Sequence, residues 1–354
     1  MAQFRLAIAL DARAADAHCN LGNALKRLGR WDESRHAYRE AIAVDPQHVS
    51  AHWNESMALL LRGDYANGFV AYEWRFSRPA SPLKPVGKPL WNGSALPNGT
   101  LFLHAEQGVG DMLQFARFLP AAQRLAKNVV LEVQAALVDL FAANFPGVRV
   151  VARGGAVPSC DVHLPVMSLA RVFHTTLENL PCSVPYLAPP PDRAVAWRVR
   201  AAETGRRRIG LVWAGNMKHN NDRYRSVAFA ALAPLFELPN IDWYGLQVGT
   251  AAVDVRDLSA RANWTDLSPH LRDFADTAAA IAALDRVVAV DTAVAHLAGA
   301  MGLPVDILLP FAPDWRWLTD RADSPWYPTA RLFRQPRPGD WAGAIDALAR
   351  TFAP

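Results

Sequence analysis

The sequence predicts helical repeats at the amino-terminal end and, after them, two α/β units that are each built on a parallel sheet. Three observations lead to this prediction. A pattern recurs with a 34-residue period over residues 15–82, a proline-rich stretch follows at 77–99, and short apolar runs alternate with helical patterns from Thr100 onward. Periods of this length are typical of stacked helical repeats, whereas alternating strands and helices are typical of parallel sheets.

The composition is that of a globular protein. Of the 354 residues, 51% are hydrophobic and 10% are aromatic, which is enough to build packed cores. The formal net charge of +4 comes from arginines spread along the chain, so we expect no nucleic-acid interface. The three cysteines lack ligand-like spacing, which predicts a reducing compartment and no zinc site. The absence of a signal peptide and of a long uncharged apolar segment predicts a cytoplasmic protein without a transmembrane segment.

The repeats are assigned to residues 1–76 and resemble tetratricopeptide repeats. The second copy is more degenerate than the first, as expected where an array meets another element. One period further back, Met1 falls inside a repeat, at its second helix, so we expect either a truncated start or another chain that covers the apolar face of this helix. The matched positions are Asn20 with Asn54, Leu25 with Leu59, Gly29 with Gly63, Trp31 with Tyr65, and Tyr38 with Tyr72.

Residues 77–99 are interpreted as an extended connector, because prolines interrupt every periodic pattern there. The first α/β unit is predicted at 100–190 and the second at 191–354, with a second proline cluster between them. The sequence leaves open whether the last helix, 340–352, packs back on the first unit. The expected strands are 100–105, 128–133 and 148–152 in the first unit, and 207–215, 241–247, 286–292 and 304–310 in the second.

A glycine-rich turn follows the first predicted strand, in the segment HAEQGVGDMLQFARFLP. A turn of this kind between a strand and a helix often cradles phosphate, but Asp111 lies where the anion would bind. Gly108 and Gly110 also lack the third glycine of a dinucleotide-binding motif, because Leu113 stands there. We therefore predict that this loop does not hold phosphate. The alternative role of Asp111 is that of an acidic residue favoured by the helix dipole.

A stronger ligand pattern occurs in the second unit, in VVAVDTAVAHLAGAMGLPV. An apolar strand ends at Val290, and Asp291 and Thr292 follow directly. The next helix would then begin at the carboxyl end of a parallel strand, where backbone N–H groups of Thr292 and Ala293 could hold a phosphate. His296 lies one turn later on a similar face. The alternatives are a plain helix cap for Asp291 and a satisfied buried histidine for His296.

The loop GLVWAGNMKHNNDRYRS follows another predicted strand and carries several cations. Dispersed positive donors of this kind suit a diphosphate, and the alternative is a solvated basic loop. Gln247, at the end of a further strand, is a weaker candidate for contact with a nucleotide. The candidate residues of the basic loop are Gly215, Asn216, Lys218, His219 and Arg225.

The aromatic residues gather in a segment near the carboxyl-terminal end of the chain. We interpret this segment as a structural wrap over the sheet, and the alternative is a surface on which a sugar stacks. Its aromatic members are Trp315, Trp317, Trp326, Tyr327 and Trp341.

These motifs resemble those of a known family. DTAVAHLAGAMGLPV resembles the signature of the ADP-heptose:lipopolysaccharide heptosyltransferases, which belong to glycosyltransferase family 9, and GVGDMLQFARFLP resembles their amino-terminal loop. The resemblance covers most of residues 91–352 and implies the GT-B architecture, in which two Rossmann-like lobes face each other. Repeats placed before such lobes are similar to the layout of peptide O-GlcNAc transferases.

The resemblance also implies roles for individual residues. Asp111 matches the catalytic base, so residues 100–190 would form the acceptor side and residues 191–354 the nucleotide-sugar side. The donor phosphates and sugar would be bound by the matching residues Asp291, Thr292 and His296, with Ala293 where glycine is common, and by Lys218, whose role His219 or Arg225 could share.

Two functions are compatible with these patterns. One is an inverting glycosyltransferase that moves a sugar from a nucleotide-diphosphate sugar to a protein or glycan acceptor recruited by the repeats. It would need no metal, because the chain contains no Asp-x-Asp triplet. We also expect no cofactor besides the nucleotide-diphosphate sugar itself. The other is a non-catalytic interaction protein, in which the repeats bind a partner and the α/β part is a degenerate nucleotide-binding unit.

Overall fold

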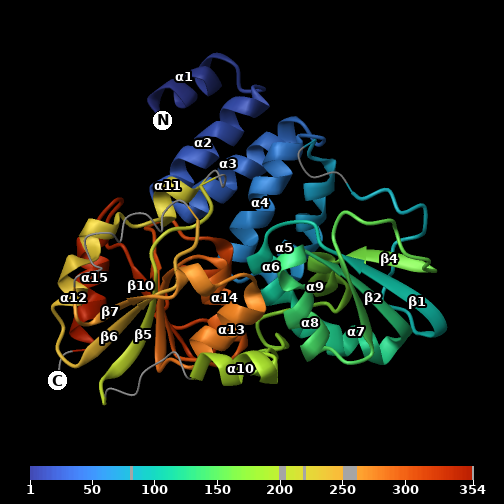
Figure 1. The fold of residues 1–354 in the computed structure, drawn as a ribbon. Helices are drawn as coiled ribbons and strands as arrows, with labels where there is room; N and C mark the ends of the chain where they lie inside the picture. The colour runs from blue at the N-terminus through green and yellow to red at the C-terminus, as the bar shows by residue number, and fades with distance from the viewer. Residues whose placement is uncertain (80–82, 199–204, 218–220, 250–260, 353–354) are drawn as a thin grey trace. The chain divides into compact units, whose positions relative to one another are not determined.

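The structure is a computed structural model, and it describes residues 1–79, 83–198, 205–217, 221–249 and 261–352 (Figure 1). Its described residues divide into two compact units, which we call the repeat unit and the α/β unit. The repeat unit contains residues 1–87, 168–180 and 311–321, and the α/β unit contains residues 88–167, 181–310 and 322–354.

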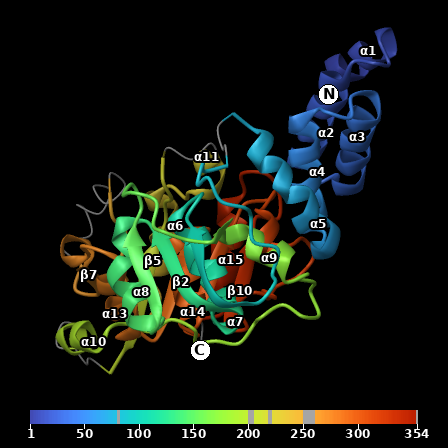
Figure 2. The same cartoon turned by 90° about the vertical axis from the view of Figure 1, so that its right-hand side faces the viewer.

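The helices of the repeat unit lie side by side as two-helix repeats (Figure 1 and Figure 2). Gly29 and Gly63, one period apart, adopt positive φ angles of 71° and 81° just after two of these helices. Only glycine adopts this left-handed turn without strain, so each one ends its helix. The elements are α1 (Ala2–Leu10), α2 (Ala15–Arg27), α3 (Trp31–Val44), α4 (Val49–Leu61), α5 (Tyr65–Ala71) and the 3-10 helix η1 (Tyr72–Ser77).

Close packing within the first repeat depends on Gly22 in α2. An added Cβ at Gly22 would lie 2.5 Å from Cε1 of Tyr38, so the glycine lets this ring of α3 lie directly on the helix. Ser34, at a position where alanine is usual, donates its hydroxyl to the Gly22 carbonyl oxygen at 2.8 Å. A buried serine is therefore tolerated here because it is hydrogen-bonded.

Two segments from distant parts of the chain complete the repeat unit: α9 (Leu169–Val172) and the 3-10 helix η8 (Trp315–Trp317). The Trp315 ring packs edge-on against Tyr65 at 6.1 Å and against Phe69 at 5.7 Å between ring centroids. Ser168 accepts a hydrogen bond from Arg75 at 2.7 Å. The sequence predicts both segments within the α/β units, whereas they pack with the repeats in the structure.

The described residues of the α/β unit form two parallel sheets. The amino-terminal lobe has four strands in the order β3-β2-β1-β4, and the carboxy-terminal lobe has six in the order β10-β9-β8-β5-β6-β7. Counted within each lobe, these orders are 3-2-1-4 and 6-5-4-1-2-3, which is the Rossmann arrangement. The strands are β1 (Leu96–His104), β2 (Ala126–Val133), β3 (Val148–Ala152), β4 (Val162–Pro165), β5 (Arg207–Val212), β6 (Ile241–Gly245), β7 (Trp264–Asp266), β8 (Arg286–Val290), β9 (Val305–Leu309) and β10 (Ala330–Arg334).

Helices alternate with these strands along the chain, as is usual where parallel strands are joined by crossovers. In the amino-terminal lobe they are α6 (Val109–Phe115), η2 (Ala116–Phe118), α7 (Leu119–Leu125), η3 (Ala135–Leu137), α8 (Val138–Asn144) and the start of η4 (Val166–Ser168). Beyond that lobe they are α10 (Pro191–Arg198), α11 (Asp222–Arg225), η5 (Phe229–Leu232), α12 (Ala233–Phe236), η7 (Ser268–His270), α13 (Phe274–Ala282), α14 (Ala293–Ala300) and α15 (Trp341–Arg350).

The last helix packs on the sheet that it follows. Ile345 and Leu348 of α15 join the hydrophobic core of the carboxy-terminal lobe, together with Ile209 of β5 and Trp243 of β6. The possibility that this helix packs back on the first α/β unit, which the sequence left open, is therefore not realised in these contacts. The buried residues of α15 form one apolar face, and this helix contacts β9 and β10.

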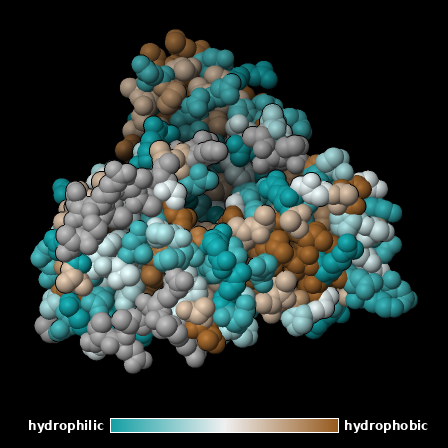
Figure 3. All heavy atoms as spheres, viewed as in Figure 1, coloured by the Kyte–Doolittle hydropathy of each residue, from teal (hydrophilic) through white to brown (hydrophobic). Residues whose placement is uncertain are grey.

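Apolar side chains gather on the surface of α1, as Figure 3 shows. Leu6 is 61% exposed and Leu10 is 82% exposed, and the described part of the chain buries no residue of this helix. Among the described residues, no helix has both the length and the apolar character that crossing a bilayer requires.

Candidate functional site

The strand order brings two loops together at the carboxyl edge of the six-stranded sheet. After β5 the chain adds β6 and β7 towards one edge of the sheet, whereas after β8 it adds β9 and β10 towards the other edge. These two strands are parallel neighbours, with Val212 opposite Ala289. Ligands of doubly wound sheets bind at such a reversal, outside the carboxyl ends of the strands. We call residues 213–217, 221–226 and 291–296, with residues 108–111 of the amino-terminal lobe, the switch-point site.

Arg225 joins the two loops of this site. Its Nη1 donates to the carbonyl oxygen of Asp291 at 3.0 Å, and its Nε donates to Oδ1 of Asp222 at 3.3 Å. Gly215 makes room for this arrangement, because an added Cβ there would lie 2.6 Å from Nη2 of Arg225. The side chain of Arg225 is 17% exposed, so it brings a positive charge to the carboxyl end of β8 in a partly desolvated position.

The first turn of α14 has the features of an anion site. Thr292 is the N-cap residue, and its side chain makes no capping hydrogen bond with the described residues. Its Oγ1 is buried and has no hydrogen-bond partner in the described part of the chain. Buried hydroxyl groups usually have partners, and an uncapped helix start presents N–H groups and a positive dipole end. A bound anion would accept hydrogen bonds from the Thr292 hydroxyl and from the N–H groups at the start of α14. Asp291, for which a capping role was the alternative, lies one residue before the cap.

His296 lies where the two lobes meet. It is 5% exposed, its Nδ1 lies 2.9 Å from the hydroxyl oxygen of Tyr327, and its Nε2 lies 3.8 Å from Oδ1 of Asp291. An added Cβ at Gly110 would lie 2.8 Å from Cδ2 of His296 and 3.7 Å from Cα of Ala293. The first turn of α6 and the beginning of α14 are therefore in contact.

Asp111 caps its own helix. It is the third residue of α6, and its Oδ2 accepts a hydrogen bond from the backbone N–H of Gly108 at 2.7 Å. Gly108 has an ordinary φ of −77°. The carboxylate is half-buried and lies next in sequence to Gly110, the residue that contacts His296. The structure thus brings Asp111, through its neighbour, to the same region as the predicted donor residues.

The remaining candidates have different surroundings. Gln247 is 5% exposed, and its Oε1 accepts hydrogen bonds from the backbone N–H groups of Trp213 at 3.2 Å and Ala214 at 2.9 Å. It therefore holds the loop after β5 in place. Asn216 is exposed in that loop. Lys218 and His219 lie outside the described residues, so their predicted roles rest on the sequence.

The carboxyl-terminal aromatic segment is a packing element. Trp315, Trp317, Trp326 and Tyr327 are each no more than 1% exposed. These four rings are too buried to stack on a sugar, so they have a packing role. Trp315 and Trp317 belong to the repeat unit, however, so the expected wrap over the sheet is wrong for these two residues.

Two residues support the site in ways that the sequence does not indicate: Arg117, which is not among the candidates, and Tyr327, which the sequence places only in the aromatic segment. Arg117 is 5% exposed and donates from Nη1 to the carbonyl oxygen of Trp326 at 2.8 Å and from Nη2 to the hydroxyl of Tyr186 at 3.0 Å. The available signal was an arginine between Phe115 and Phe118, because a charge on an apolar helical face requires buried partners.

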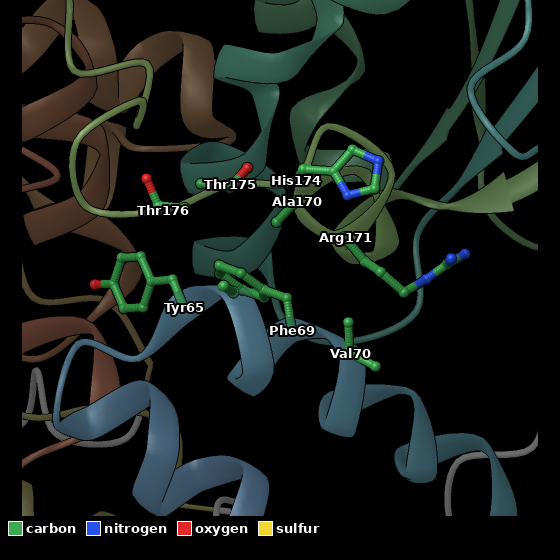
Figure 4. A pocket seen from close by; sticks show the side chains of 9 residues that line it. Tyr65, Phe69, Val70, Ala170, Arg171, His174, Thr175 and Thr176 are labelled. Atoms are coloured by element: carbon green, nitrogen blue, oxygen red, sulfur yellow. The ribbon is translucent and has the colours of Figure 1, made fainter.

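A separate cavity lies in the repeat unit. Its volume is about 160 Å³, and Figure 4 shows side chains of α5 on one side and those of residues 170–176 on the other. None of the predicted site residues lines it. Tyr65 and Phe69 form its buried aromatic side, whereas Val70 at its edge is 62% exposed. In the described part of the chain, no group of three or more His, Cys, Asp or Glu side chains is arranged to hold a metal ion.

Comparison with known sequences supports the assignment of the repeats. Residues 19–81 match the family model of the tetratricopeptide repeat. Protein FlbA of Caulobacter vibrioides is 29% identical over 324 residues, covering 83% of this chain and 54% of FlbA. The chain thus spans about half the length of this curated relative.

Comparison with solved structures identifies the fold of the α/β unit. The glycosyl transferase family 9 structure from Veillonella parvula has a TM-score of 0.54 and 9% identity, covering 74% of this chain and 99% of that one. The ADP-heptose lps heptosyltransferase II of E. coli has a TM-score of 0.50 and 14% identity, covering 71% and 99%. The protein therefore combines tetratricopeptide repeats with a GT-B fold like that of family 9 glycosyltransferases.

Proposed function

We propose that this protein is a glycosyltransferase that moves a sugar from a nucleotide-diphosphate sugar to a protein or glycan acceptor. The observation that carries the proposal is the convergence of Arg225, the buried Thr292 hydroxyl and the uncapped start of α14 at the switch point of the six-stranded sheet. These groups offer positive charge and hydrogen-bond donors at one place, which is what a diphosphate requires.

The donor side would stabilise the leaving group. As the bond between the sugar and the diphosphate breaks, negative charge grows on the phosphate oxygens. The helix N-terminus at Thr292 and the guanidinium of Arg225 can offset this charge, and Lys218 and His219 of the same loop would add to it. We infer that these groups take the place of a metal ion in a metal-independent reaction.

The acceptor side would supply the base. The acceptor oxygen attacks the anomeric carbon from the face opposite to the diphosphate, its proton passes to the carboxylate of Asp111, and the nucleoside diphosphate leaves, which inverts the anomeric centre. The contact of Gly110 with His296 supports this assignment, since it brings the α6 turn next to the donor residues. An ionised carboxylate accepts several hydrogen bonds, so the bond from Gly108 does not prevent Asp111 from taking a proton.

One observation favours the second candidate, a non-catalytic protein that binds a nucleotide and recruits a partner through its repeats. The hydrogen bond from Gly108 to Asp111 is an ordinary helix-capping contact, and it explains the carboxylate without any catalytic role. In that case the donor side would bind a nucleotide diphosphate, but no sugar transfer would follow.

Thermal shift and hydrolysis assays with ADP-, UDP-, GDP- and dTDP-linked sugars separate the two functions. The enzyme requires one nucleotide sugar that both stabilises the protein and is turned over, with turnover lost in Asp111→Asn. Stabilisation without turnover by any of the four would indicate the scaffold. If no nucleotide or nucleotide sugar stabilised the protein, the enzyme would be rejected, and an interaction protein whose α/β part has lost nucleotide binding would be favoured.

A further inference from the structure

The imidazole of His296 is enclosed by residues from three segments. Tyr327 contacts its Nδ1 through a hydroxyl 2.9 Å away, Gly110 lies against its Cδ2 edge, and Asp291 lies 3.8 Å from its Nε2. The ring is therefore held in one orientation, and its two nitrogens face different groups.

Gly299 determines where the tyrosine lies. It is three residues after His296 on α14, and an added Cβ there would lie 2.5 Å from Cδ1 of Tyr327. The ring of Tyr327 therefore lies directly on the helix backbone and is fully buried. This placement brings its hydroxyl level with the imidazole, one turn away on the same helix face.

Arg117 fixes the segment that carries the tyrosine. Its guanidinium carbon lies 5.0 Å from the centre of the Tyr327 ring, and its Nη1 donates to the carbonyl oxygen of Trp326. Arg117 belongs to η2, which directly follows α6, the helix that carries Gly110. One segment of the amino-terminal lobe thus contacts both His296 and the residue that orients it.

We propose that Tyr327 is a positioning residue, whose hydroxyl sets the orientation and the tautomer of His296 so that Nε2 faces Asp291 and the bound donor. The proposal rests on the proposed function, because it assigns His296 to the donor phosphate or sugar. The hydrogen bond at one ring nitrogen determines what the other nitrogen can do. Replacing a partner that orients a metal-ligating histidine typically costs about 10–100-fold in activity, and we expect an effect of similar size at His296.

The test is Tyr327→Phe, which keeps the ring on Gly299 and removes only the hydroxyl. The imidazole ¹⁵N chemical shifts of His296, assigned with a His296→Gln variant, report the tautomer and the titration without any substrate. We expect one dominant tautomer in the wild type and a changed tautomer ratio in the variant. Tyr186→Phe is the matched control. The Tyr186 hydroxyl accepts a hydrogen bond from the same Arg117, but it donates to the carbonyl oxygens of Leu113 and Gln114 in α6 and not to His296. This control should leave the His296 signals unchanged.

Unchanged ¹⁵N shifts in Tyr327→Phe would overturn the proposal. An equal mixture of both His296 tautomers in the wild type would also overturn it, and this second measurement does not depend on the variant folding. Nucleotide binding is measured separately, so the two failures are distinguishable. A shift at His296 with no binding of any nucleotide would reject the proposed function while leaving the hydrogen-bond assignment intact. With a donor in hand, kcat for Tyr327→Phe should fall about 10-fold with little change in thermal stability.

Discussion

Gly110 of α6 and His296 of α14 lie in direct contact, although they come from different lobes of the α/β unit. The absence of a side chain at Gly110 is what allows the imidazole to lie there. This contact connects the turn after β1, which precedes the proposed base, with the helix that follows β8.

The contact predicts the effect of Gly110→Ala. The added methyl group would have to displace the imidazole, which costs about 1–3 kcal/mol when a packed site is overfilled. We expect a lower thermal midpoint and a smaller nucleotide-induced shift. Gly155→Ala is the control, because the nearest described atom to its added Cβ is 3.8 Å away. Equal stability of the two variants would contradict the close packing of the lobes at this point.

Asp111→Asn separates catalysis from binding. An asparagine oxygen can still accept the hydrogen bond from Gly108, so the helix cap is retained. Loss of the base should reduce turnover about 10²–10⁴-fold, while the nucleotide-induced thermal shift stays within error. Asp139→Asn, at the first turn of α8, is a matched change outside the site. If Asp111→Asn turned over at the wild-type rate, Asp111 would be only a cap.

Thr292→Val should have opposite effects on stability and on binding. A buried hydroxyl without a partner costs about 1–3 kcal/mol, so its replacement by an isosteric methyl group should leave the ligand-free protein equally stable or more stable. The same change removes a donor from the proposed phosphate site and should weaken nucleotide binding. Chemical unfolding and isothermal titration give the two values. A marked loss of stability without ligand would mean that the hydroxyl has a partner inside the protein.

Stability should decrease as the pH falls below the ordinary histidine range. Burial lowers the pKa of His163, which lies in β4 and is 3% exposed. Its Nδ1 lies 3.0 Å from Nε2 of His104. Below about pH 6.5 the unfolded chain takes up a proton at this residue that the folded protein resists, so the free energy of unfolding drops. Urea unfolding at a series of pH values measures this. His163→Gln should reduce the change in the free energy of unfolding per pH unit. If this pH dependence were the same in the variant, it would come from other groups.

Asp276 predicts a second dependence at lower pH. Burial alone would raise the pKa of Asp276, but hydrogen bonds from Arg272 and Arg193 outweigh this effect and hold the pKa at about 2. The carboxylate therefore stabilises the fold above about pH 4, and this contribution is lost as the pH falls towards 2.

Asp276→Asn should lower the free energy of unfolding at neutral pH by about 1–2 kcal/mol, a discounted value because Arg272 is mostly exposed. The difference between wild type and variant should shrink in acid. Asp192→Asn, which removes an exposed partner of the same Arg193, should have little effect. A difference that persisted at pH 2 would assign the loss to packing instead of charge.

The sequence by itself determined the features that depend on local periodicity. The 34-residue repeat and its helix-ending glycines, Gly29 and Gly63, follow from the backbone conformation that each turn requires. The parallel direction of the strands and the location of the Asp291–Thr292 turn follow from apolar runs that alternate with helical patterns. These patterns are local because the backbone geometry of a strand or a helix determines which nearby residues in the chain share one face.

Only the tertiary structure decided which distant side chains meet. The packing of Trp315 on Tyr65 and Phe69, the use of Gln247 to hold the loop after β5, and the link from Arg117 through Tyr327 to His296 join segments that are far apart in sequence. The residue type of a buried tryptophan, glutamine or tyrosine does not show whether its side chain packs in the core or binds a ligand. Its role depends on which surface the folded chain brings against it, because the partner is chosen by burial and hydrogen bonding between elements and not by neighbouring residues.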